Sequence, residues 1–461
     1  MNTIAHRSLS SAAPAELVDV SLYCTIEALE DNLTVNNFRG CTHYSINGKP
    51  WRAYNEGETP AINAGETISF KGARDYEMVS TVSVSKKFNL RGNLMSIITG
   101  NKSFTDTVTF TQLFERQPVV EVSDDFLQSL PQWCALARMF YRCTSLIKAP
   151  VLPYKSGMTL YCNEMFYGCT ALTHAPDLPA TELGPGCYRY MFAECTSLTH
   201  APDLPALTIS SSGYAYMFAG CTALVNAPSI SATQLNSSSC RSMFSGCTSL
   251  ANAPALHAKK LKDTCYDSMF AGCTALVYAP VMSPEYLESN SCARMFSGCT
   301  ALINAPELPA IATAIRCYQY MFYGCSALLN APELPATTLN TECYYYMFAG
   351  CTSLTHAPDL PALTLGDYCY QGMFKGCSSL IEAPELLAPK TSIFCYREMF
   401  YGCSQLNYIK VLSTDVFGQS QNSFKDWVVG VAATGTFVRS ADARLYEGTI
   451  PNGWTVEYAD E

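Results

Sequence analysis

One stretch of 26 residues decides the fold of this chain: MFAGCTSLTHAPDLPALTLGDYCYQG, from Met347 to Gly372. The Met-Phe pair that opens this stretch occurs eleven times, and successive pairs are always 26 residues apart. The eleven pairs begin at Met139, Met165, Met191, Met217, Met243, Met269, Met295, Met321, Met347, Met373 and Met399. A fixed period of 20 to 50 residues is the mark of a solenoid or a similar array. The chain is therefore predicted to stack eleven copies of one small unit.

Two further positions never vary among the units when residues are counted from the methionine as offset zero. Cysteine stands at offset 4 in every unit, from Cys143 to Cys403, and leucine stands at offset 7, from Leu146 to Leu406. A second cysteine precedes the methionine by three to five residues in ten units, and Gly213 replaces it in the other. Apolar positions that recur in every unit are expected to line up as buried columns.

The local pattern predicts one short parallel strand and one short helix in each unit. Around C-Y-x-Y-M-F the apolar residues fall at offsets −4, 0, 1 and 4, which is one face of a short helix. The glycine found at offset 3 of most units would end that helix. The following A-P-x-L-P stretch cannot be helical, because proline lacks an amide donor and pushes its predecessor to extended geometry. This combination is the leucine-rich-repeat design.

The motif M-F-x-G-C-T-x-L-x-x-A-P-x-L-P-A resembles the BspA-like, or Treponema-type, leucine-rich repeats that are abundant in Bacteroides and their phages. The resemblance covers residues 134–411 directly. It implies a role in adhesion or recognition at surfaces, without a cofactor.

An antiparallel β domain is predicted before the array. Residues 1–16 form an N-terminal arm, and the β domain covers residues 17–105. Apolar and polar residues alternate over Leu17–Ala28, which is typical of a half-buried strand, and Asn47-Gly48 is a strong hairpin signal.

Each end of the array is expected to carry a cap. Residues 106–138 form a degenerate capping repeat, in which Leu113 lies 26 residues before Met139 and Gln117 replaces the cysteine at offset 4. The regular solenoid then covers residues 139–412, and residues 413–461 form a β-rich C-terminal cap. Caps are needed because the end of a solenoid must cover its own core.

The composition excludes several classes of partner. The formal net charge is −10, so the chain repels phosphate backbones, and we expect no nucleic-acid partner. No run of about 18 apolar residues occurs, so we expect no membrane insertion. The stretch from Met1 to Val18 lacks the apolar core of a secretory signal. We therefore expect synthesis in the cytoplasm, followed by placement on a virion or a cell surface.

The 23 cysteines suggest a disulfide framework, but their spacing favours reduced thiols. Within one unit the two cysteine columns are separated by about 10 to 13 Å of predicted helix, which is too far for a bond. Equivalent cysteines of adjacent units would approach to about 4.8 Å, which a disulfide permits. We favour a ladder of buried thiols that act as small apolar side chains.

Metal and catalytic sites are disfavoured. A C-x4-H spacing occurs at Cys169 and His174, Cys195 and His200, and Cys351 and His356. The cysteine is expected to point inward and the histidine outward, and no C-x2-C pair completes a zinc ligand set. The His-Ala-Pro-Asp segments that begin at these histidines recur along a surface, whereas a catalytic triad needs a single cleft. We predict no catalytic residue, no metal and no cofactor.

An exposed polar strip at offsets 9 and 12 is the candidate binding site. These positions vary while the leucine columns stay fixed, and a regular solenoid face presents an extended binding surface of about 50 Å. The strip comprises His174, Asp177, His200, Asp203, Asn226, Asn252, Tyr278, Asn304, Glu307, Asn330, Glu333, His356, Asp359, Glu382, Glu385 and Tyr408. Two alternatives stay open: copying of the unit reproduces a merely solvated face, or the stacked carboxylates hold Ca²⁺.

The leading hypothesis is a non-enzymatic adhesion or recognition protein that binds a surface protein or glycan of a host or neighbouring cell. The alternative is a phage virion component, such as a tail-fibre or capsid-decoration protein that attaches to the host. Its partners would be other virion proteins or further copies of the chain. This alternative explains a surface-type repeat without a secretory signal, because virions assemble in the cytoplasm and leave by lysis. An enzyme is the third hypothesis.

Overall fold

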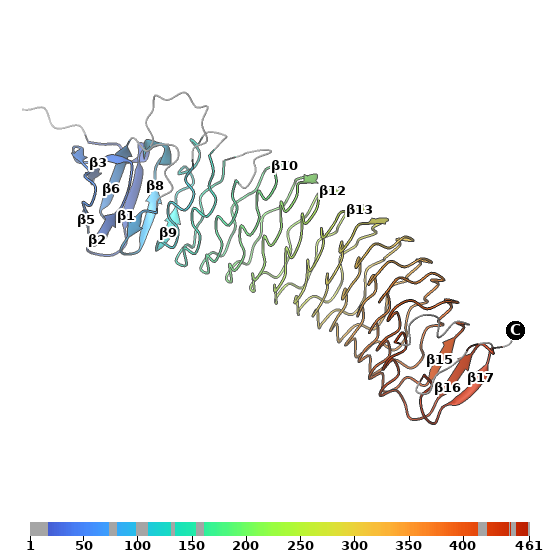
Figure 1. The fold of residues 1–461 in the computed structure, drawn as a ribbon. Coiled ribbons are helices and arrows are strands. Elements are labelled where there is room, and N and C mark those ends of the chain that lie inside the picture. Colours follow the sequence, from blue (N-terminus) through green and yellow to red (C-terminus); the bar gives the residue numbers. More distant parts are fainter. Residues whose placement is uncertain are drawn as a thin grey trace, which may run out of the picture.

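The structure, a computed structural model, is an elongated, curved repeat array with a β domain at its N-terminal end (Figure 1). The described residues are 17–72, 81–97, 109–130, 134–153, 161–413, 422–441, 443 and 449–459. The predicted N-terminal arm lies outside them. The predicted repeat solenoid is confirmed, and equivalent residues of successive units pair in parallel along it.

The N-terminal β domain is built mainly from short antiparallel strands. Its elements are η1 (Val20–Leu22), β1 (Cys24–Ala28), β2 (Leu33–Asn36), β3 (Cys41–Ile46), β4 (Arg52–Ala53), β5 (Ala61–Ile62), β6 (Thr67–Gly72), β7 (Ser83–Val84), β8 (Phe88–Arg91) and η2 (Leu94–Ile97). The main sheet has the order β4-β3-β6-β1-β8-β9, and β5-β2-β7 form a second sheet. In the middle of the main sheet, the fully buried Ile26 lies beside Ile68 of β6 and Leu90 of β8.

This sheet runs directly into the array. Strand β9 (Val119–Val122), in the degenerate capping repeat, pairs in parallel with β8, and Glu121 then bridges to Lys148 of the first regular unit. Gln117 stands at the position of the missing cysteine, and its side-chain oxygen accepts a hydrogen bond from the Val84 amide at 2.8 Å. The β domain and the solenoid therefore share one hydrogen-bonded ladder.

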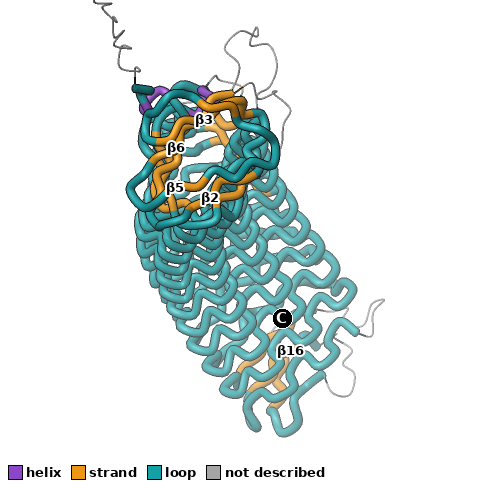
Figure 2. Tube along the Cα trace, turned by 90° about the vertical axis from the view of Figure 1, so that its left-hand side faces the viewer, coloured by secondary structure: helices purple, strands orange, loops and turns teal. Residues whose placement is uncertain are grey.

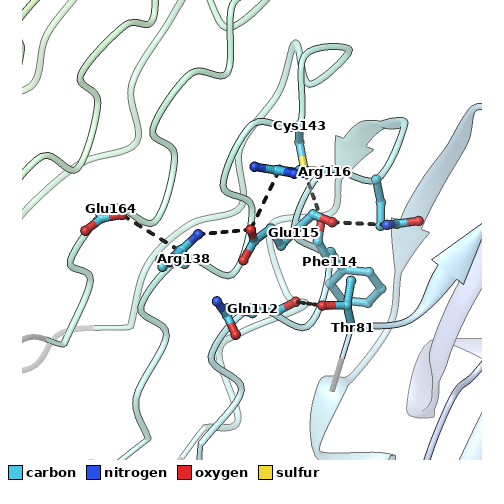
Figure 3. Close-up of polar contacts among 9 residues, drawn as sticks. Thr81, Gln112, Phe114, Glu115, Arg116, Arg138, Cys143 and Glu164 are labelled. Carbon is cyan, nitrogen blue, oxygen red and sulfur yellow. Dashed lines mark hydrogen bonds and ion pairs between the residues drawn. The ribbon is translucent and has the colours of Figure 1, made fainter. Parts of the chain in front are cut away.

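Side-chain contacts strengthen this junction (Figure 3). The Glu115 carboxylate, which is 13% exposed, lies 3.0 Å from the Arg138 guanidinium, and Arg138 in turn reaches Glu164 at 3.7 Å. The Thr81 hydroxyl donates to the Gln112 carbonyl at 3.1 Å. The chain of charges links the capping repeat to the first regular unit.

Two lines of parallel pairing join neighbouring units. Two-residue strands at offsets 17 and 18 lie along one long edge of the array (Figure 1). They are β10 (Glu182–Leu183), β11 (Thr208–Ile209), β12 (Gln234–Leu235), β13 (Lys260–Leu261) and β14 (Tyr286–Leu287). The second line consists of single parallel bridges at offset 9, such as the bridge between His174 and His200. Both lines keep equivalent residues one above the other.

The predicted helix in each unit is wrong. Within the described part of the repeats no α-helix occurs, and the array consists of loops and turns stacked one behind the next (Figure 2). Asn290, Arg294 and Gly298 have φ angles of 53°, 54° and 75°, so every fourth residue is in the left-handed region. An α-helix requires a negative φ at each position. A continuous helix therefore cannot form over offsets −5 to 3, which we call the turn segment.

The amides of the turn segment alternate between two kinds of acceptor. Ala293 and Met295 donate to carbonyls three residues earlier in their own unit, whereas Arg294 and Phe296 donate to Gln319 and Met321 of the next unit, at 2.8 and 2.9 Å. In a helix every amide would donate to the carbonyl four residues before it. Half of these amides therefore bind neighbouring units together.

The core consists of continuous columns. The Met, Phe, Cys and Leu at offsets 0, 1, 4 and 7 are fully buried in all eleven units. Phenylalanine rings stack without interruption from Phe114 to Phe400, with ring centroids 5.5 to 5.9 Å apart. Each cysteine thiol at offset 4 donates to the carbonyl of the preceding unit's phenylalanine, as Cys299 does to Phe270 at 3.1 Å.

The C-terminal region continues the array in irregular form. Strands β15 (Tyr408–Val411), β16 (Thr436–Arg439) and β17 (Thr455–Tyr458) pair in parallel. The Phe400 amide donates to the carbonyl of Trp427, so this tryptophan occupies the methionine position after an interval of 28 residues. Trp427 is fully buried and covers the last ring of the phenylalanine stack at 5.9 Å.

Replacement of Phe270 by alanine tests the ring column. Phe270 lies between Phe244 and Phe296, at 5.5 and 5.7 Å, and its removal leaves a cavity that the rigid backbone ladder cannot close. We expect the free energy of unfolding, measured with urea, to fall by about 3 to 5 kcal/mol. The Leu207→Ala control, at a side chain that is 59% exposed, should change it by less than about 0.5 kcal/mol. Equal losses in the two variants would contradict the column.

Candidate functional site

The candidate strip lies on the outer surface of the array. Its offset-9 residues pair through parallel bridges, from His174 to His200 and from Asn226 through to Tyr408, so their side chains project from equivalent positions of the backbone. All sixteen strip residues are exposed except Tyr408, which is half-buried. The expected exposure is thus observed, and binding by the strip stays a prediction.

Hydrogen bonds and ring contacts order neighbouring side chains at offset 9. The Asn252 amide donates to Asn226 at 2.9 Å, and the Asn330 amide donates to Asn304 at 3.2 Å. The rings of His174 and His200 stack with centroids 4.5 Å apart. An ordered surface loses less conformational entropy on binding than a mobile one.

Carboxylates dominate the offset-12 column. Asp203 accepts the Ser229 hydroxyl at 2.6 Å, and Glu385 pairs with Lys410 at 2.7 Å. Glu307 and Glu333 line a hollow of about 380 Å³ between adjacent units. The other walls of this hollow are mainly prolines: Pro306, Pro309, Pro332 and Pro335. Proline keeps these walls rigid because its ring fixes φ.

An apolar centre interrupts the acidic strip. Val281, at offset 12, is 81% exposed, and Tyr278 of the same unit is 62% exposed. Tyr278 belonged to the predicted strip, but Val281 did not, because the prediction followed the acidic residues of this column. The sequence could have indicated Val281, because it is an apolar residue in a largely acidic column. Exposed aromatic side chains such as Tyr278 are typical anchors of binding surfaces.

The cysteine ladder is structural. In each C-x4-H pair the thiol is fully buried and the histidine is exposed, so the structure does not bring the two together as ligands. Among the described residues no group of three or more His, Cys, Asp or Glu is arranged to hold a metal ion. Burial raises the pKa of the Cys195 and Cys299 thiols to about 12, so neither is a ready nucleophile. The cysteines at offset 4 are free thiols, as expected.

No helix in the described part of the chain is long and apolar enough to cross a membrane.

The coiled units, their parallel ladders and their leucine columns define a leucine-rich-repeat solenoid, a class of protein that recognises other molecules through its exposed faces. The chain matches the family 'BspA type leucine-rich repeat region (6 copies)' over residues 137–277, 187–303 and 292–427. These matches cover more than half of the chain, which therefore belongs to this family, and they confirm the resemblance inferred from the motif.

Other comparisons add little. Among curated proteins, none matches the chain. A solved structure, the crystal structure of a TLR13-ssRNA13 complex, has 11% sequence identity and a TM-score of 0.23. The match covers 70% of this chain and 47% of that one, so this chain spans about half of its length. At so low a TM-score, nothing about the RNA of that complex transfers to this chain.

The buried thiols make stability depend on pH. The pKa of Cys299 rises from 9.0 to about 12 on folding because burial disfavours the thiolate. The folded state therefore keeps the proton that the unfolded state releases, and stability present below pH 9.0 is lost as the pH rises toward about 12.

We expect the free energy of unfolding to fall more steeply above pH 9.0 for the natural chain than for Cys299→Ala. The difference should be about 1.4 kcal/mol per pH unit, which corresponds to one proton. Urea titrations across this pH range measure both slopes. Parallel slopes would contradict a buried, protonated thiol.

Proposed function

We propose that this protein is a non-enzymatic recognition protein whose strip binds a protein exposed on a surface. The observation that carries the proposal is the contrast between the invariant buried columns and the exposed, variable strip. The columns hold the strip in a fixed geometry, so each unit contributes its own side chains to one extended face. Family membership supports a role in recognition.

The chemistry of the strip favours a partner with a basic face that has an apolar contact region at its centre. Asp177, Asp203, Glu307, Glu333 and Asp359 place negative charge on both sides of Tyr278. Complementary charge speeds association and sets orientation, whereas a central aromatic residue supplies much of the affinity. A protein surface can offer both features over the length of the strip, so a protein is favoured over a glycan here.

The place of action is a further part of the proposal. A bacterial cell surface and a phage virion would both expose the strip to another cell. Mass spectrometry of purified virions and of surface-labelled cells distinguishes them. The protein should occur in one of these two fractions, and its confinement to the cytosol would contradict both placements.

Paired tyrosine variants test the strip. Tyr278 and Tyr286 belong to one unit and have similar exposure, 62% and 65%, but only Tyr278 lies in the strip. On an array of cell-surface ectodomains and glycans, we expect Tyr278→Ala to weaken binding of the recognised ectodomain about tenfold or more. Tyr286→Ala should bind like the natural chain. The proposal fails if the two variants lose affinity equally, or if binding maps entirely to the N-terminal β domain.

A further inference from the structure

A second surface of the array carries a different chemistry from the strip. Exposed and half-buried tyrosines and arginines gather on the turn segments, which the buried columns at offsets 4 and 7 separate from the strip along the chain. Tyrosine and arginine are among the residue types that are enriched at protein interfaces and at their hot spots. The strip prediction did not include any of these residues.

One part of this surface is hollowed. Residues from four consecutive units line a hollow of about 460 Å³, among them Arg294, Arg316, Tyr320, Glu342 and Tyr345. This volume lies in the range of small-molecule sites and suits one or two sugar rings. The residues fall near offsets −5 to −1 of their units, so only stacking of the units brings them together.

The single carboxylate of the hollow, that of Glu342, is already hydrogen-bonded within the protein. Glu342 accepts two hydrogen bonds from Arg316, at 2.9 and 2.8 Å, and a third from Gln319 at 2.7 Å. This two-pronged pairing neutralises Glu342 and fixes the Arg316 side chain. Arg316 and Glu342 together therefore add no net charge to the hollow.

Arg294 supplies the second positive charge of the hollow. Its guanidinium lies 5.3 Å from the centroid of the Tyr320 ring, and no carboxylate of a described residue lies within 4.0 Å of it. The nearby Asp267 carboxylate pairs with Arg241 at 3.1 Å, and the charges of Arg241 and Arg294 both oppose the rise in its pKa that burial causes. Arginine binds a planar carboxylate through two parallel hydrogen bonds. Because Arg294 has no ion-pair partner among the described residues, its guanidinium favours an anionic ligand group.

Tyrosine rings form the walls. Tyr320 and Tyr345 meet edge to face, with centroids 5.4 Å apart and planes at 81°. Tyr346 stacks on Tyr320 at 5.5 Å and contacts Tyr345 at 4.6 Å, so the rings hold one another in place. Fixed aromatic faces pack well against the C–H face of a sugar ring, and their hydroxyl groups reach its hydroxyls.

We propose that this hollow binds an acidic sugar residue of a glycan, a uronic or a sialic acid. The carboxylate pairs with Arg294, and the sugar ring packs against Tyr320 or Tyr345. A long polyanion is disfavoured, because the chain as a whole has a net charge of −10. The site lies outside the strip, so it does not depend on the protein partner proposed above.

Titration calorimetry on the full chain tests the site with three probes: sialyllactose, a disaccharide that contains glucuronic acid, and neutral lactose. We expect at least one acidic probe to bind at least tenfold more tightly than lactose. Arg294→Ala should weaken that binding tenfold or more and leave the thermal midpoint unchanged, since this side chain is exposed. Tyr345→Ala should also weaken it.

Two matched controls are available four units and five units away. Arg189, also exposed, lies 5.2 Å from the Tyr190 ring without lining the hollow, and Tyr216 stacks on Tyr190 at 4.4 Å. Arg189→Ala and Tyr216→Ala should bind the acidic probe like the natural chain. The assignment is overturned if lactose binds equally well, if Arg189→Ala loses as much affinity, or if no probe binds. Tyr278→Ala should retain the acidic sugar, so failure of one proposal leaves the other testable.

Discussion

The structure depends on the hydrogen bond that every second amide of the turn segment donates to the next unit. The bond from Phe296 to Met321, at 2.9 Å, has an equivalent between each pair of regular units. Because these bonds run along the array, each unit is held by its neighbours rather than by a helix of its own. An insertion within the turn segment would shift its donors past their acceptors, which explains why the spacing inside this segment is kept in every regular unit.

The core columns follow from the same constraint. Units bonded in register place identical side chains above one another, so the phenylalanine rings must stack and the thiols must form a ladder. Cysteine suits offset 4 because it is small and apolar and its thiol reaches the carbonyl of the preceding phenylalanine. Valine would fill similar space but would lack this donor. The buried thiol therefore does more than the apolar filling that its pattern alone suggested.

The sequence predicted the period, the buried columns and the exposure of the strip, because each depends on residues that recur or vary at fixed offsets. For the turn segment, the sequence pattern led to the wrong prediction of a helix. Burial at offsets −4, 0, 1 and 4 fits a helix of 3.6 residues per turn and also fits turns that repeat every four residues. The left-handed positions carry Arg294, Ser268 and Tyr320 rather than glycine alone, so composition did not reveal them.

The hollow beside Arg294 could not be predicted from the sequence for another reason. Its residues fall at offsets −5, −2 and −1 of four units, where the residue type changes from unit to unit, so each column taken alone shows no pattern. Val281 was missed because it departs from the acidic residues of its column. Features that every unit repeats identify the scaffold, whereas features that single units break mark the candidate sites.

The left-handed turns can be tested directly at Ser268, whose φ angle is 57° and whose amide donates to Ala293 of the next unit at 2.8 Å. Ser268→Gly and Ser268→Ala both remove the hydroxyl, so the difference between their free energies of unfolding isolates the backbone. Glycine should be more stable than alanine by about 1 kcal/mol, because a left-handed φ strains any residue with a Cβ. In a helix the sign reverses, because glycine is about 1 kcal/mol less favourable than alanine. A more stable alanine variant would contradict the stacked-turn structure.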